Sequence, residues 1–121
     1  MNQEFNDLPW HDAELKDILI DRSRDSIKIK ISWPENDDDD YVFIEFLNCY
    51  AFKADMTFGM TPPDCIFEAE CILHSQELED IKKLWSEMKI DIPELRCYRI
   101  NTNSTNSTIK FFALGFRIID V

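Results

Sequence analysis

Residues 26–33 (SIKIKISW) alternate between apolar and polar side chains without interruption. On an extended chain this period of two puts every second side chain on the same side, so one face collects the apolar residues Ile27, Ile29, Ile31 and Trp33. The pattern is typical of an antiparallel strand that is buried on one face and solvated on the other. The chain must therefore form a sheet whose apolar face is covered by another part of the molecule.

Six further segments have an extended character: 14–21, 41–48, 49–58, 65–73, 95–101 and 108–119. Only residues 75–89 depart from it, because their apolar side chains recur every three or four positions, at Leu78, Ile81, Leu84, Trp85 and Met88. This spacing predicts one amphipathic helix, with Ser75 as N-cap and Lys89 in the last turn. Seven strands and one helix with short connections predict an α+β fold: a mainly antiparallel sheet with the helix packed on it, in a single domain over 1–121.

The composition excludes several classes of function. Gly59 and Gly115 are the only glycines, and phosphate-binding loops need several glycines at fixed spacing. The formal charge of −11 opposes binding to nucleic acid or to anionic membranes, and it favours a basic protein partner.

The N-terminal residues lack the basic and apolar regions of a signal peptide, so we expect a cytoplasmic protein. In that compartment the four cysteines should be reduced thiols. The sequence has no C-x-x-C pair, and its two histidines are far apart, so we expect no metal and no cofactor.

Two pairs of residues are candidates for a catalytic or ligand site. If His11 and Asp12 lie in an extended segment, they face opposite sides and form no dyad, so we expect Asp12 to bind turn amides and His11 or Trp10 to cover a sheet end. Glu68 and Glu70 lie two apart on one strand, so their carboxylates could approach to about 7 Å, as in an inverting glycosidase. Paired acids on the wet face of a strand are also common without any activity.

Two connections are candidates for partner binding. The acidic run Asp37, Asp38, Asp39 and Asp40 lacks the alternating ligands and the glycine of a calcium-binding loop, and we interpret it as a solvated hairpin tip. Phe58 and Met60 flank a glycine just before two prolines. These two side chains either enter the core or form a contact surface for a partner.

The succession WHDAEL, IDR, IKIKISWP, VFIEFLNC and DCI over residues 9–75 resembles a loose family of small bacterial proteins. Its members have a His-Asp element before a β-hairpin, and some resemble immunity proteins of polymorphic toxin systems. The resemblance implies no catalytic residues.

We therefore expect a non-enzymatic protein-interaction module, of which an immunity-type inhibitor of a basic toxin is one form. The alternative is a small enzyme or ligand-binding protein with a pocket between helix and sheet that uses His11, Asp12, Glu68 or Glu70. A homodimer through an edge strand is compatible with either hypothesis.

Overall fold

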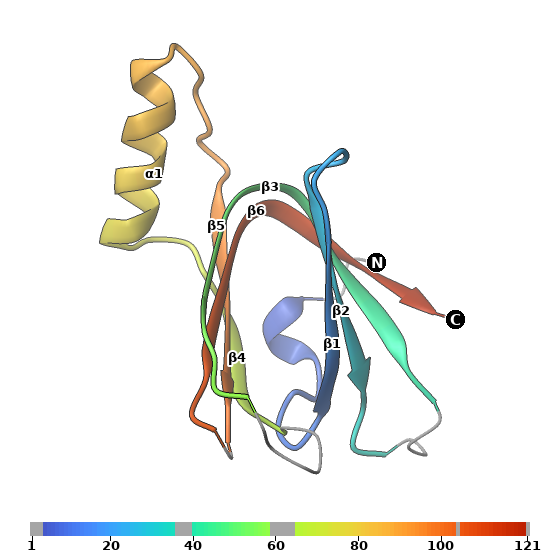
Figure 1. Ribbon diagram of the computed structural model, residues 1–121. Coiled ribbons are helices and arrows are strands. Elements are labelled where there is room, and N and C mark those ends of the chain that lie inside the picture. The colour runs from blue at the N-terminus through green and yellow to red at the C-terminus, as the bar shows by residue number, and fades with distance from the viewer. Residues whose placement is uncertain (1–3, 36–39, 59–64, 104, 121) are drawn as a thin grey trace.

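The computed structural model describes residues 4–35, 40–58, 65–103 and 105–120. Its elements follow one another along the chain as η1 (a 3-10 helix, Phe5–Asp7), β1 (Glu14–Asp21), β2 (Ser26–Ser32), β3 (Val42–Asp55), β4 (Ile66–Ile72), α1 (Gln76–Glu87), β5 (Arg96–Thr102) and β6 (Thr108–Asp120) (Figure 1). All strand pairs are antiparallel, in the order β1-β2-β3-β6-β5-β4. The predicted α+β fold, a mainly antiparallel sheet with one amphipathic helix, is confirmed.

The sheet has six strands where the sequence predicts seven, because 41–48 and 49–58 belong to one strand. β3 has 14 residues, and its register with β6 shifts between Cys49 and Ala51. Just before the shift, Asn48 has a φ of 54°. A bulge of this kind bends a strand without ending it, and β6 pairs with β3 on both sides of the bend.

The bent pair of β3 and β6 forms an arch (Figure 1). β1 and β2 extend one arm of the arch, β5 and β4 extend the other, and η1 lies between the arms. The alternating residues of β2 point into this interior, where Ile27, Ile29 and Ile31 are buried as the pattern predicts. Near the bend, the rings of Phe46 and Phe111 stack with their centroids 4.1 Å apart.

The N-terminal segment fills the space between the arms. The ring of Phe5 lies 4.7 Å from that of Trp10 and 4.9 Å from that of Tyr98. The indole Nε1 of Trp10 donates a hydrogen bond to the carbonyl of Phe5 (2.7 Å), so its polar atom is satisfied although the residue is buried. This inner core therefore includes residues that precede the first predicted strand.

α1 covers part of the outer face of the sheet. The Ser75 hydroxyl accepts a hydrogen bond from the amide of Leu78 (3.2 Å), which confirms the predicted N-cap. Leu78 is fully buried and packs against the side chains of Cys97 and Phe112. The predicted apolar face is wider than the face that the sheet covers, because Leu84 and Met88 are more than half exposed.

No helix among the described residues is long and apolar enough to span a bilayer.

Candidate protein-binding surface

The proposed partner-binding residues belong to two connections of the sheet. Asp40 is exposed, and its backbone carbonyl accepts a hydrogen bond from the Ser32 hydroxyl (3.0 Å). Phe58 is 82% exposed, the most exposed large apolar side chain of the described residues. The other members of the set, Asp37, Asp38, Asp39 and Met60, lie outside the described residues.

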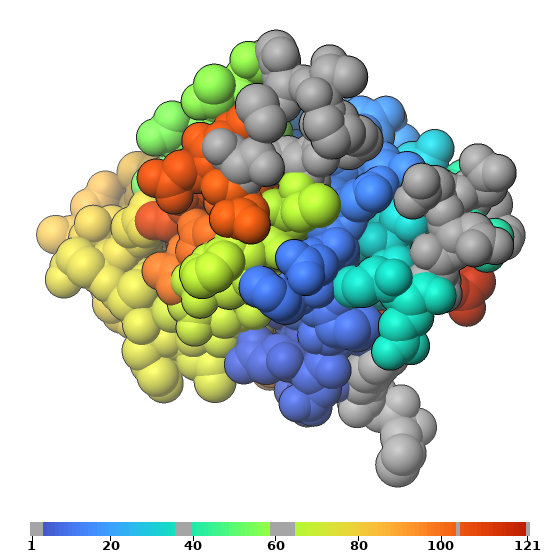
Figure 2. All heavy atoms as spheres, turned by 90° about the horizontal axis from the view of Figure 1, so that it is seen from below, coloured from blue at the N-terminus to red at the C-terminus, as the bar shows by residue number. Residues whose placement is uncertain are grey.

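Contacts between loops bring these connections to the same end of the sheet. Ser32, at the end of β2, pairs with Glu14, and Glu14 forms a bridge with Cys65 after the β3–β4 connection. The carbonyl of Cys65 accepts a hydrogen bond from the amide of Asn103 (2.8 Å), which holds the β5–β6 connection at the same end of the sheet. Figure 2 looks onto this end and shows the blue residues of the first turn and β1 between yellow-green β4 and the cyan β2–β3 region.

The structure corrects the expectation for His11 and Asp12. Asp12 has a φ of 69° and lies in a turn rather than an extended segment, so the two side chains approach each other, with His11 Nε2 3.7 Å from Asp12 Oδ2. His11 Nδ1 lies 3.0 Å from the carbonyl oxygen of Phe67, to which it donates a hydrogen bond. The backbone of the same turn pairs with Ile66 through the amide of Asp12 (2.9 Å) and the carbonyl of Ala13 (2.7 Å). This turn joins β1 to β4, whereas the Asp12 carboxylate accepts no hydrogen bond from a turn amide among the described residues.

Glu68 and Glu70 each have a partner on the neighbouring strand β5. Glu68 accepts a hydrogen bond from the Asn101 amide (3.1 Å), and Glu70 forms an ion pair with Arg99. A bulge between Ile66 and Glu68 turns Ile66 into the core, so it does not share the face of the two glutamates. Each carboxylate is thus engaged across the sheet, an arrangement that stabilises strand pairing and requires no catalytic role.

Ion pairs on the protein occupy six of its basic side chains. The pairs are Lys16–Glu14, Lys53–Glu77, Lys82–Glu79, Arg99–Glu70, Lys110–Glu77 and Arg117–Glu45. Hydrogen bonds from Lys110 and Lys53 hold the pKa of Glu77 below its ordinary value. We call the end of the sheet where the turn at His11 and Asp12 joins β1 to β4 the clasp end. There, Glu35 and Asp40 are exposed and form no ion pair with another described residue. The chain therefore presents a surplus of carboxylates to solvent.

The four cysteines are free thiols, and in three of them burial opposes ionisation. Burial raises the pKa of Cys49 and of Cys97 to about 11, and it also raises the pKa of Cys71. Thiols with such values stay protonated at neutral pH, and the protonated form is a poor nucleophile. No group of three potential metal ligands occurs among the described residues.

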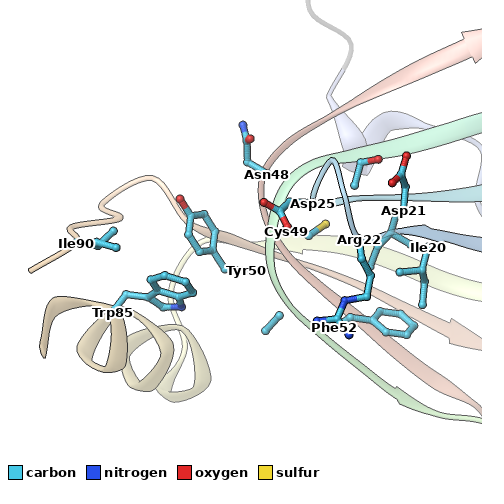
Figure 3. A pocket seen from close by; sticks show the side chains of 13 residues that line it. Ile20, Asp21, Arg22, Asp25, Asn48, Cys49, Tyr50, Phe52, Trp85 and Ile90 are labelled. Atoms are coloured by element: carbon cyan, nitrogen blue, oxygen red, sulfur yellow. The ribbon is translucent and has the colours of Figure 1, made fainter. Parts of the chain in front are cut away.

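A cavity of about 690 Å³ lies between the β1–β2 hairpin, the bend of β3 and the end of α1 (Figure 3). Its apolar lining includes Ile20, Phe52, Trp85 and Ile90, and Asp21, Arg22 and Asp25 contribute charged groups. The alternative hypothesis expects a pocket between helix and sheet, but His11, Asp12, Glu68 and Glu70 do not line this one. One feature of the sequence could have indicated this cavity: Ile20 is an apolar residue next to the polar turn of the predicted hairpin.

Comparisons of the chain with protein-family models, with curated proteins and with solved structures find no match.

Proposed function

We propose that the chain is a non-enzymatic, cytoplasmic protein-interaction module that binds a basic protein. The observation that carries this proposal is the distribution of charge. Five acidic side chains pair with six basic ones, while the acids at the clasp end, Glu35 and Asp40, are exposed and form no ion pair among the described residues. With a formal charge of −11, such a surface accelerates encounter with a positively charged partner and selects against acidic ones.

Apolar side chains at the same end supply contacts that would hold the complex. Phe58 is 82% exposed, and Phe67 is 51% exposed with its ring 6.0 Å from that of His11. Aromatic residues that become buried in an interface dominate its free energy of binding and control mainly the dissociation rate. We therefore expect the acidic residues to control mainly the association rate of the partner and Phe58 to control mainly its dissociation rate.

An immunity-type inhibitor of a basic toxin is the specific form of this proposal. A toxin that acts on nucleic acid or on anionic membranes carries basic residues around its active site, and an acidic protein can occlude them. A gene for such a toxin next to the gene for this chain would support this form. A position inside a metabolic operon would favour the alternative of a small ligand-binding protein or enzyme.

The experiment is a pull-down from the source cells followed by binding kinetics with the purified partner at two salt concentrations. Replacing Asp37, Asp38, Asp39 and Asp40 by asparagine should lower the association rate about tenfold at low salt and flatten its salt dependence. Phe58→Ala should leave association unchanged and increase the dissociation rate.

A matched control removes the same number of charges elsewhere, at Glu79, Asp80, Glu87 and Asp91, which are all exposed on α1 or just after it. This variant should keep most of the association rate. An acidic partner, or an association rate that responds equally to both sets of substitutions, contradicts the proposal.

A further inference from the structure

Among the strands of the described residues, the second half of β3 has a neighbour on one side only. β2 lies beside the first half, and the last backbone contact on that side is the amide of Cys49 donating to the carbonyl of Asp25 (2.8 Å). The hairpin turns back at this point, whereas β3 continues to Asp55 in register with β6. On the side away from β6, no backbone hydrogen bond joins residues 51–55 to any other residue that the structure describes.

The outer strands β1 and β4 differ, because local contacts occupy backbone groups on both. On β4, the amide of Ile66 donates to the carbonyl of Ala13 (2.7 Å), and the amide of Cys71 donates to the side chain of Asn6 (2.7 Å). On β1, the amide of Ile18 donates to the carboxylate of Asp17 (2.8 Å). Such contacts, together with the bulges in both strands, are how proteins protect sheet edges from adding another strand.

The cavity of about 690 Å³ opens against the unprotected part of β3. Ala51 and Phe52 both line it, although Ala51 packs in the cluster under the helix and Phe52 packs in the inner core. Consecutive residues of a strand point to opposite faces, so a cavity that touches both meets the strand at its edge. Figure 3 shows Ile20 on the hairpin side of this edge and Trp85 on the helix side.

We propose that residues 51–55 of β3 accept an extended segment of the basic partner as an additional strand, with one apolar side chain of that segment in the cavity. This inference rests on the proposed function and names the part of the partner that binds. The free backbone groups would supply main-chain hydrogen bonds, and the cavity would supply specificity for a side chain. The edge ends at Asp55, three residues before the exposed Phe58, so it is continuous with the surface assigned above.

The charges around this edge favour a basic segment. Asp21 and Asp25 line the cavity together with one basic residue, Arg22, and Asp55 is exposed at the other end of the edge, so acids outnumber bases there. Hydrogen bonds from Ser23 hold the pKa of Asp21 below its ordinary value, so this carboxylate is charged at neutral pH. Lys53, on the same edge, forms an ion pair with Glu77 (3.1 Å), a carboxylate that also pairs with Lys110.

The proposal is tested by nuclear magnetic resonance on the ¹⁵N-labelled full chain with the peptide acetyl-KVKVKVK-amide at low salt. We expect shifted signals and slower hydrogen exchange at the amides of residues 51–55. A peptide with the same side chains and N-methylated valines, and the peptide acetyl-EVEVEVE-amide, should bind at least tenfold more weakly. Unchanged exchange at β3, or equal binding of the N-methylated peptide, would overturn the proposal.

A pair of neighbouring substitutions tests the cavity. Ile20 lines it and is 56% exposed, whereas Leu19 is 45% exposed and points to the opposite face of β1. Ile20→Lys should weaken binding of the basic peptide about tenfold, because it places a positive charge in the cavity, and Leu19→Lys should change it less than twofold. If the two substitutions weaken binding equally, the cavity does not bind a side chain of the peptide and this part of the proposal is wrong.

The two proposals can fail separately. If a basic partner binds wild-type protein and Ile20→Lys equally and leaves the amides of β3 unchanged, the proposed function stands and the strand addition is wrong. If the peptide binds at β3 but the only partner recovered is acidic, the site stands and the proposed function is wrong. Concentration-dependent dimerisation through β3 that excludes the peptide would assign the edge to a second copy of this chain and overturn the inference.

Discussion

The two faces of the sheet are buried in different ways. The inner face is enclosed by the arms of the arch and filled by the N-terminal segment, so that Phe5, Phe46 and Phe111 are nearly inaccessible. Among the described residues, the outer face is covered by α1 and by Ile92 and Leu95 of the segment that follows it, and of the helix's own residues only Leu78 is fully buried. A sheet can thus keep a closed core on one side while its other side remains accessible. This difference predicts where the chain tolerates substitution and where it does not.

The largest expected effect comes from the inner face. Phe46→Ala should lower the free energy of unfolding by about 3–5 kcal/mol, because the buried side chains around the cavity left beside Phe111 can relax only partly to fill it. Urea denaturation followed by tryptophan fluorescence measures this. The control is Phe43→Ala, which removes the same group from the outer side of β3, where the residue is only partly buried. If both variants lose the same free energy, the two faces do not differ as we describe.

The next effect concerns the outer face. Leu78→Ala should cost about 2–3 kcal/mol and should loosen the helix while the inner core persists. Cys97 is a local probe of this loosening, because it lies under the helix and burial raises its pKa to about 11 from an ordinary value of 9.0. The native thiol keeps its proton to higher pH than the unfolded thiol does, so its contribution to stability decreases as pH rises from about 9 to 11.

Alkylation by iodoacetamide at pH 8.5 provides the measurement. Cys97 should react slowly in the wild-type protein and at least tenfold faster in Leu78→Ala, since exposure returns its pKa toward the ordinary value. Mass spectrometry after digestion identifies the modified residue. Faster alkylation of Cys49 to the same degree would indicate global unfolding and would contradict a local loosening of the helix.

A smaller effect is expected at the clasp that holds the N-terminal segment over the inner face. His11→Ala removes the hydrogen bond to the carbonyl of Phe67 at an exposed site and should cost about 1 kcal/mol. Thermal unfolding should show the corresponding decrease in Tm. A variant that keeps its Tm but loses affinity for an identified partner would assign His11 to binding instead.

The smallest effect is a gain in stability at the end of the helix. Lys89 has a φ of 65°, and the amide of Ile90 donates to the carbonyl of Trp85 (3.0 Å), as in a Schellman motif. Lys89→Gly removes the strain of a left-handed side chain and should raise the free energy of unfolding by about 0.5–1 kcal/mol. The neighbouring Met88→Gly should instead destabilise, because Met88 has a φ of −93°. A loss of stability in Lys89→Gly would contradict this account of the helix end.

Local patterns in the sequence are enough to predict the individual elements. The alternation at 26–33 predicts a strand because the face that a side chain occupies depends only on its position in the repeat. The helix and its start at Ser75 follow for the same reason, since an N-cap hydrogen bond spans three residues.

How these elements meet depends on contacts between distant parts of the chain. β3 is one strand because β6, from the other end of the chain, pairs across its bend. The side chains of His11 and Asp12 approach because the turn is held to Ile66 and Phe67, more than 50 residues away. Turns in which Asp12, Asp25 and Asn48 adopt positive φ take the place of glycines, so the usual signal for a turn or bulge is missing from the sequence. The free edge of β3 and its cavity depend on where β2 stops, and that position is a property of strand pairing, which a local pattern does not encode.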